Sequence, residues 1–216
     1  MQILLCSATE MEIRPVIDWL NQNNFDHTDV LITGVGLLAT TYSLAKQVGS
    51  KKPDLILQAG IAGAFDKTIP LGSVKIVRHD IIGDLGVEEL GAFRSVFSLQ
   101  LADEDSFPFA GGRLTASDHW ILKSGIPFAD GISVNEISTT KKRMDYYTLT
   151  LGAAIETMEG AACHYVGLME RIPFLQLRAV SNYAGERDKN LWELDLAITN
   201  LNTTLIHLIK KMIYET

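Results

Sequence analysis

The sequence predicts an α/β fold in which a central sheet lies between layers of helices. Several apolar runs have the length of a strand and are apolar at consecutive positions, which is typical of strands covered on both faces. Helical periodicities separate these runs, and strands that alternate with helices indicate many parallel connections. The chain has 216 residues, 47% of them hydrophobic. That is enough to bury a proper core, and we expect one domain over residues 1–216.

The individual elements follow from the spacing of apolar residues. The predicted strands occupy residues 3–8, 30–33, 55–59, 74–77, 132–134, 153–155 and 174–180. Ile13, Val16, Ile17 and Leu20 recur at helical spacing. A longer apolar stripe over 201–213 predicts the last helix, and a further helix fits 161–169, after a glycine. Residues 103–112 are interpreted as a connection within the domain.

Composition excludes several classes of partner. The formal net charge is −7, and nucleic-acid binding needs clustered Lys and Arg. The short cluster Lys141 to Arg143 is interpreted as a solvated helix start. No basic stretch precedes an apolar segment with a cleavage site, and no run approaches the roughly 18 apolar residues of a membrane span. We expect a cytoplasmic protein that contacts neither nucleic acid nor membrane.

The two cysteines, Cys6 and Cys163, both lie in apolar runs. This placement is typical of reduced core residues and indicates neither a disulfide framework nor a metal site. We therefore expect no metal and no cofactor.

Glu12 follows the first predicted strand, in the stretch "CSATEMEIRP". Thr9 and Glu12 have the spacing of a capping box. Pro15, however, would be about the sixth residue of a helix that began after Thr9, where its missing N–H interrupts the ladder. We therefore expect the helix to begin near Glu12 or Ile13, which leaves Glu12 at the carboxyl edge of the sheet, where ligands bind in open α/β folds.

Two further stretches place special residues at strand ends. Gly60 to Gly63 follow an apolar strand and let the backbone approach a ligand closely, but the stretch taken alone favours a simple turn. They match neither a dinucleotide fingerprint nor a Walker motif. Glu159 falls where a strand gives way to a helix. It is explained either by the helix dipole or as an acceptor for two adjacent sugar hydroxyls.

The stretch "LRAVSNYAGERD" carries a buried strand into polar residues. Asn182 at its end is either a turn former or a side chain that faces a ligand. Arg178 lies inside the apolar part, and a buried arginine needs a carboxylate partner. Glu159 and Glu156 are both candidates for that partner.

In this order and spacing, the stretches resemble the nucleoside phosphorylase and nucleosidase superfamily. The resemblance rests on "GVGLLATTYSLAKQ", "KPDLILQAGIAGAF", "IETMEGAA" and "LRAVSN", and covers nearly the whole chain. It implies a three-layer α/β/α sandwich with a mixed central sheet, a purine nucleoside and water as small-molecule partners, and a homodimer or higher homo-oligomer.

The resemblance also implies roles for single residues. Glu12 matches the water-activating glutamate of the hydrolytic members, Met158 and Glu159 match the ribose clamp, and Asn182 matches the purine-reading side chain. The substrate-binding set that it implies further includes Gly60, Ile61, Ala62, Ile137, Arg178 and Ser181.

Within the superfamily, the residues favour hydrolysis of a 6-oxopurine nucleoside. Ile61 stands where phosphorylases carry a phosphate-binding serine, although Arg14 leaves phosphorolysis open. Nucleosidases that act on methylthioadenosine and adenosylhomocysteine carry aspartate at the position of Asn182. An amide NH₂ instead suits the two acceptors N7 and O6 of hypoxanthine, and one unpaired buried polar group costs about 1–3 kcal/mol.

Residues 83–93 and 181–197 also resemble the futalosine hydrolase subfamily. Futalosine carries a benzoate on its 5′ substituent, so a cation should lie near it. Arg94, Arg187 and the cluster Lys141 to Arg143 are the candidates. A methylthioadenosine/adenosylhomocysteine nucleosidase, a purine nucleoside phosphorylase and a silent nucleoside-binding protein remain the alternatives.

Overall fold

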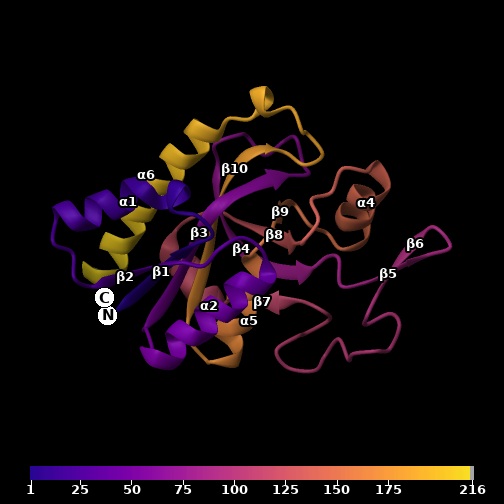
Figure 1. The fold of residues 1–216 in the computed structure, drawn as a ribbon, viewed down its shortest axis with the longest axis horizontal. Coiled ribbons are helices and arrows are strands. Elements are labelled where there is room, and N and C mark those ends of the chain that lie inside the picture. Colours follow the sequence, from indigo (N-terminus) through magenta and orange to yellow (C-terminus); the bar gives the residue numbers. More distant parts are fainter. Residues whose placement is uncertain (215–216) are drawn as a thin grey trace.

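The fold was analysed in a computed structural model that describes residues 1–214. Its centre is an eight-stranded sheet with the order β10-β4-β8-β9-β3-β1-β2, and β7 pairs with β4 outside that path. A separate hairpin of β5 and β6 extends away from the sheet (Figure 1). The strands are β1 (Ile3–Ser7), β2 (Thr28–Ile32), β3 (Leu55–Ala64), β4 (Val74–Ile82), β5 (Gly86–Glu89), β6 (Ala92–Ser95), β7 (Leu114–Thr115), β8 (Phe128–Ser133), β9 (Ile155–Thr157) and β10 (Phe174–Tyr183).

The sheet is mixed, as predicted, and part of it closes on itself. The pairs β1–β2, β1–β3, β3–β10, β4–β8 and β8–β9 are parallel, whereas β4–β10, β3–β9 and β4–β7 are antiparallel. Because β10 pairs with both β3 and β4, the strands β10, β4, β8, β9 and β3 form a ring. The apolar runs do not reveal this closure, since it depends on pairings between distant segments.

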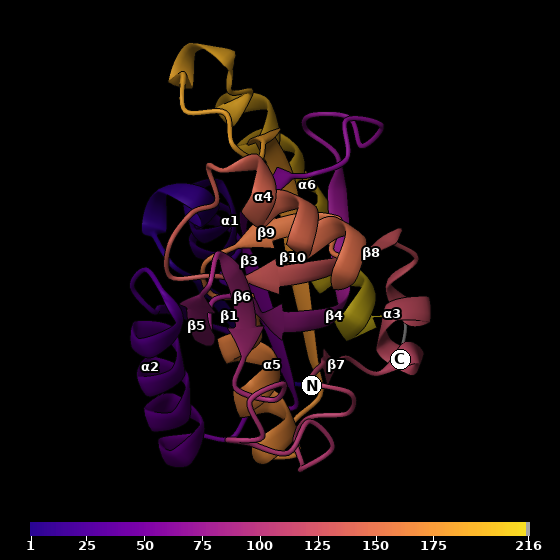
Figure 2. The ribbon, with the colours of Figure 1, turned by 90° about the vertical axis from the view of Figure 1, so that its right-hand side faces the viewer.

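Helices cover the sheet in two groups (Figures 1 and 2). Helix α1 (Glu10–Gln22) packs on α6 (Leu194–Tyr214), which lies against β3 and β10. Helix α2 (Leu37–Ser50) packs on α5 (Gly160–Met169), which lies against β4 and β8. The shorter helices are α3 (Asp118–Ser124) and α4 (Lys141–Asp145), and a π-helical turn (Tyr146–Thr150) follows α4. The predicted start of a helix at Lys141 is confirmed.

The core forms where the consecutive apolar runs predicted it. Leu5 of β1, Leu57 of β3 and Leu177 of β10 are completely buried, together with Ile13 of α1 and Leu205 of α6. Covering both faces of these strands removes their side chains from water, which is the main favourable term in folding. Cys6 and Cys163 are buried and free, as predicted. Across residues 1–214, no helix is long and apolar enough to cross a membrane.

Three strands, β3, β4 and β10, run further than the sequence predicts, and β4 continues to Ile82 instead of ending at Val77. β3 continues through Gly60 and Gly63 as far as Ala64, so the interpretation of these glycines as a turn is wrong. β10 continues past Val180 to Tyr183, and its register with β3 shifts between Val180 and Asn182. An extra residue in one strand bends it locally and changes the direction of the following side chain. The polar end of this strand is therefore still part of the sheet.

Helix α1 begins at Glu10, not near Glu12 or Ile13 as expected, so Pro15 lies inside it. Thr9 is the extended N-cap, with φ −132° and ψ 149°, and Glu12 completes the capping box. The backbone next to Pro15 has a partner outside the helix: the side chain of Asn202 contacts the N–H of Val16 and the C=O of Glu12. The expectation failed because this contact from α6 cannot be read from local sequence.

Candidate active site

A solvent-open cavity of about 250 Å³ lies at the carboxyl ends of β1, β3 and β10. Three parallel strands end here, which is where open α/β sheets bind ligands. The loop after β1, the end of β3, the junction of β9 with α5 and the end of β10 each contribute lining residues. The cavity brings together most of the predicted site: Glu12, Ile61, Ala62, Ile137, Met158, Glu159, Ser181 and Asn182.

Glu12 is held at the floor of this cavity by hydrogen bonds to both of its carboxylate oxygens. Its Oε2 accepts from the Thr9 N–H at 3.1 Å, the Thr9 hydroxyl at 2.7 Å and the Ser7 hydroxyl at 3.2 Å. Its Oε1 accepts from the Ile61 N–H at 3.0 Å. A carboxylate offers about four acceptor sites, two on each oxygen, so Oε1 retains one for a further donor. Capping and a position in the cavity, which the sequence offered as alternatives, occur together.

Glu159 is the N-cap residue of α5 and is 5% exposed. Its Oε2 accepts from Arg178 Nη1 at 3.3 Å, and its Oε1 accepts from the Gly36 N–H at 3.2 Å. Arg178 is itself 2% exposed and also donates to the Ile61 carbonyl at 3.3 Å. The predicted need for a carboxylate partner is therefore met by Glu159, and the alternative partner, Glu156, does not pair with Arg178.

Gly60 and Arg178 lie behind the cavity and do not line it, in contrast to the expectation that they contact substrate. A Cβ built on Gly60 would stand 2.5 Å from Arg178 Nη1 and 2.9 Å from Glu12 Oε1. The glycine is thus required for the approach of two side chains, and its contact with substrate stays a prediction. Sequence alone does not show which neighbour uses the space that a glycine leaves.

Asn182 stands at the edge of the cavity, and both ends of its amide are hydrogen-bonded. Its Oδ1 accepts from the Ser181 hydroxyl at 2.9 Å, and its Nδ2 donates to the Tyr183 carbonyl at 3.0 Å. Across the sheet it pairs with Gly63, where a Cβ would stand 3.4 Å from Asn182 Nδ2. Gly63 and the strand irregularity at Ser181 together leave room for the amide.

Glu156 lines the cavity, but the sequence offered it only as a partner for Arg178. Its two oxygens accept from the Ser138 N–H at 3.4 and 3.2 Å. Burial raises the pKa of this carboxyl, and the contacts with Ser138 oppose that shift. A carboxylate inside an apolar run was the available signal. Met11, Val35, Gly63 and Thr157 also line the cavity and were not predicted.

Of the arginines proposed as ligands, one lines the cavity and the others form ion pairs elsewhere. Arg187 lines the cavity, and its guanidinium lies 5.8 Å from the centre of the Trp192 ring. Arg94 instead bonds Glu89 within the β5–β6 hairpin at 2.7 Å, and Arg143 bonds Glu88 at 3.0 Å. Arg14, the candidate phosphate ligand, pairs with the acidic side chains on its own helix and does not line the cavity.

A further layer of buried polar side chains lies on β4, β8 and α5. Asp80 of β4 is completely buried, and its Oδ1 accepts from the Ser133 hydroxyl at 2.9 Å. Burial raises the pKa of Asp80 to about 7, although Ser133 and Arg178 act in the opposite direction. On α5, burial lowers the pKa of His164 to about 4. Charge is unfavourable in this layer because the interior cannot replace the solvation that water provides.

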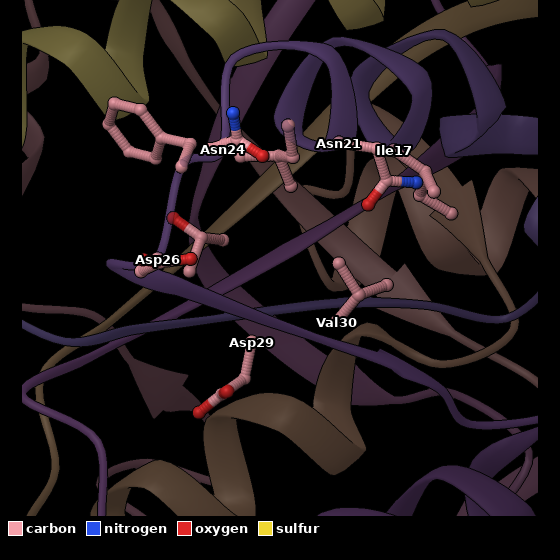
Figure 3. Close-up of a pocket in the computed structure, with 9 residues that line it drawn as sticks. Ile17, Asn21, Asn24, Asp26, Asp29 and Val30 are labelled. Atoms are coloured by element: carbon pink, nitrogen blue, oxygen red, sulfur yellow. The ribbon is translucent and has the colours of Figure 1, made fainter.

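A different hollow of about 320 Å³ lies between α1 and β2 (Figure 3). Asn21, Asn24, Asp26 and Asp29 surround it, and none of the predicted site residues lines it. It also lies away from the carboxyl ends of β3 and β10, so we do not assign the chemistry to it.

Comparisons with known proteins agree with this geometry. The family model described as "Phosphorylase superfamily" matches residues 30–213. A futalosine hydrolase from Thermus thermophilus is 29% identical over 79% of this chain and 76% of its own. A 5′-methylthioadenosine/S-adenosylhomocysteine nucleosidase from Colwellia psychrerythraea is 25% identical over 89% of this chain and 83% of its own. A crystal structure of the Colwellia nucleosidase in complex with adenine superposes with a TM-score of 0.82 at 16% identity, covering 98% and 95% of the two chains.

The fold and the cavity define an α/β protein with three buried carboxylates, Glu12, Glu156 and Glu159, along the cavity at the strand ends. The chain belongs to the phosphorylase superfamily. The resemblance inferred from the sequence is therefore confirmed, and the relatives just described are named as hydrolases and nucleosidases.

The buried carboxyl of Asp80 predicts a specific dependence of stability on pH. Between its ordinary pKa of 3.8 and its folded pKa of about 7, the folded chain binds more protons at this group than the unfolded chain. The resulting contribution to stability is fully present below about pH 4 and is lost as the pH rises to about 7. The free energy of unfolding of the wild type, minus that of Asp80→Asn, should therefore decrease across this window.

Urea unfolding at several pH values from about 4 to 8 measures this difference. His164 titrates in both proteins, so its contribution cancels. A difference that stayed constant with pH would contradict the assigned pKa of Asp80.

Proposed function

We propose that the protein hydrolyses the N-glycosidic bond of futalosine and releases hypoxanthine. The observation that carries the proposal is the joint position of Glu12, Glu159 and the amide of Asn182 on one cavity. A carboxylate to activate water, a second carboxylate to hold a sugar and a donor for the base are the groups that hydrolysis of a purine nucleoside requires. The curated relatives named as nucleosidases and futalosine hydrolase support the same class of reaction.

Glu12 acts on the water. In the proposed mechanism, its Oε1 accepts a proton from a water molecule next to C1′, while Ile61 N–H, Thr9 and Ser7 hold the carboxylate in place. Glu159 accepts hydrogen bonds from the 2′- and 3′-hydroxyls. Both carboxylates also favour the positive charge that develops on the sugar as the C1′–N9 bond stretches.

Asn182 acts on the leaving base. The electron pair of the breaking bond moves into the purine, and the one amide N–H that is not donated to the Tyr183 carbonyl stabilises it by donating between N7 and O6. Its strength comes from being held in place by Ser181 and Tyr183, since a carboxamide is a poor proton donor. Water supplies the proton that the released hypoxanthine finally carries.

Hydrolysis is favoured over phosphorolysis by the side chains near Glu12. Ile61 offers no polar side-chain atom to a phosphate, and Arg14 is paired on the outer surface of α1. Methylthioadenosine is the second candidate substrate, because nucleosidases for it are also relatives of this chain. The amide at position 182 favours the 6-oxopurine, since a carboxyl oxygen at this position would meet O6 unfavourably.

Glu12→Gln tests whether the chain is an enzyme or a silent binding protein. The amide keeps the shape but removes the base, so kcat should fall by about 10²- to 10⁴-fold while nucleoside affinity changes little. Steady-state hydrolysis and calorimetric binding measure the two quantities. Glu10→Gln, in the same helical turn but exposed, is the matched control and should keep full activity. Equal rates for wild type and Glu12→Gln would contradict the proposed role.

Asn182→Asp tests the choice of base. Wild type should release hypoxanthine from futalosine faster than adenine from methylthioadenosine, without a requirement for phosphate. In Asn182→Asp the ratio of the two kcat/KM values should move toward methylthioadenosine by about 5- to 150-fold, the cost of one mismatched polar group. Chromatographic detection of the released bases gives both values. An unchanged ratio would remove the argument from Asn182.

Arg187→Ala tests the cation for the 5′ benzoate. We place Arg187 at this position because it alone among the three proposed sites of positive charge lines the cavity within residues 1–214. KM for futalosine should rise about 10-fold or more, as expected when one charged hydrogen bond of about 1.5–3 kcal/mol is lost. KM for inosine, which lacks the benzoate, should stay the same. Arg94→Ala is the control, and an equal effect of both variants would count against Arg187.

A further inference from the structure

The side chain of Asn202 enters the first helix beside its proline. Asn202 lies on α6 and is 2% exposed. Its Oδ1 accepts from the Val16 N–H at 3.0 Å, and its Nδ2 donates to the Glu12 carbonyl at 2.8 Å. These are the two backbone groups that the regular i to i−4 pattern of an α-helix would join to each other. The carboxamide thus supplies partners for both groups of one step in the ladder.

Pro15 interrupts the hydrogen-bond ladder in the same turn. Proline has no N–H and its ring crowds the carbonyl four residues earlier, that of Met11, so the missing step lies directly next to the one that Asn202 contacts. A buried N–H or C=O without a partner is unfavourable. Asn202 is well suited to this position, because a carboxamide combines a donor and an acceptor in one planar group.

The same turn carries the side chain that faces the cavity. Glu12 receives the Asn202 contact on its backbone carbonyl, and its own carboxylate accepts from Ile61 and Thr9 a few atoms away. The backbone of Glu12 is therefore tied to α6 on one side while its side chain is tied to β3 on the other. Asn202 does not line the cavity, so any effect it has on substrate must pass through α1.

We propose that Asn202 is a positioning residue for Glu12: its carboxamide fixes the proline-containing turn of α1 so that the Glu12 carboxylate stands at the reacting water. The inference rests on the proposed role of Glu12 in hydrolysis. The expected effect of Asn202 on the rate follows from geometry, because a misplacement of about 1 Å in a reacting group costs about 100-fold in rate.

Two substitutions of Asn202 distinguish a role in positioning Glu12 from a role in packing α6 against α1. Asn202→Asp keeps the shape and an acceptor for the Val16 N–H but removes the donor to the Glu12 carbonyl. Asn202→Leu removes both. The matched control is Asn200→Leu, because Asn200 lies on the same helix and donates to a different backbone carbonyl, that of Gly72, at 2.8 Å. Each variant is made in the wild type and in Glu12→Gln, and thermal unfolding reports the fraction that is folded.

Asn202→Leu should lower kcat about 10- to 100-fold with KM within about twofold of the wild type, and Asn202→Asp should lower kcat less. In the Glu12→Gln background, measured with excess enzyme, Asn202→Leu should cause less than about a twofold further loss, because the group it positions is already absent. Asn200→Leu should leave kcat unchanged in the wild-type background.

Three results would overturn the inference: an unchanged kcat in both Asn202 variants, an equal loss with and without Glu12, or an equal loss in Asn200→Leu. If Asn202→Leu does not fold, Asn202→Asp decides by the same criteria. All ratios are taken on the nucleoside that the wild type cleaves fastest. A preference for a nucleoside other than futalosine would therefore remove the proposed substrate and leave the test of Asn202 intact.

Discussion

The site depends on one interaction, the buried ion pair between Arg178 and Glu159. Removing an arginine from water is unfavourable unless its charge is paired. Glu159 and the carbonyl of Ile61 both accept from Nη1, and Gly60 leaves the space in which they do so, whereas the buried Nε and Nη2 have no hydrogen-bond partner within residues 1–214. The ion pair joins β10 to the start of α5, while Gly36 ties α2 to the same carboxylate. The position of the Glu159 carboxylate is thus a consequence of charge compensation in the core.

Glu12 shows how a structural and a chemical role coincide in one carboxylate. Its Oε2 closes the N-terminus of α1 through Thr9, and its Oε1 faces the Ile61 N–H at the end of β3. A group that caps a helix is already held by backbone donors, and reacting groups benefit from being held before substrate arrives. Because α1 begins soon after β1 ends, the carboxylate that caps α1 lies at the edge of the sheet where α/β folds bind ligands.

Most of the predicted cavity residues came from the resemblance to the superfamily. Apolar runs predicted the long strands and the helices α1, α5 and α6, because such runs report burial directly, but α2, α3 and β5 to β7 were not predicted. Local patterns did not predict contacts between distant segments. Closure of the sheet depends on β10 pairing with both β3 and β4, and the start of α1 depends on Asn202. Gly60 was assigned to the ligand because its neighbours, Glu12 and Arg178, come from other elements. Glu156 was overlooked as a lining residue because its strand is short and its direction depends on β3.

The contact between Asn202 and Glu12 joins residues that are 190 positions apart in the chain. Contacts of such separation form late, since a long loop must first be closed. The contacts of Asn202 with the helix that carries Glu12 therefore form only after α6 has docked. During synthesis, a nascent chain that has already formed β1, α1 and β3 still lacks the carboxamide that pairs beside Pro15. The last helix thus completes the hydrogen bonding around Glu12, a residue near the start of the chain.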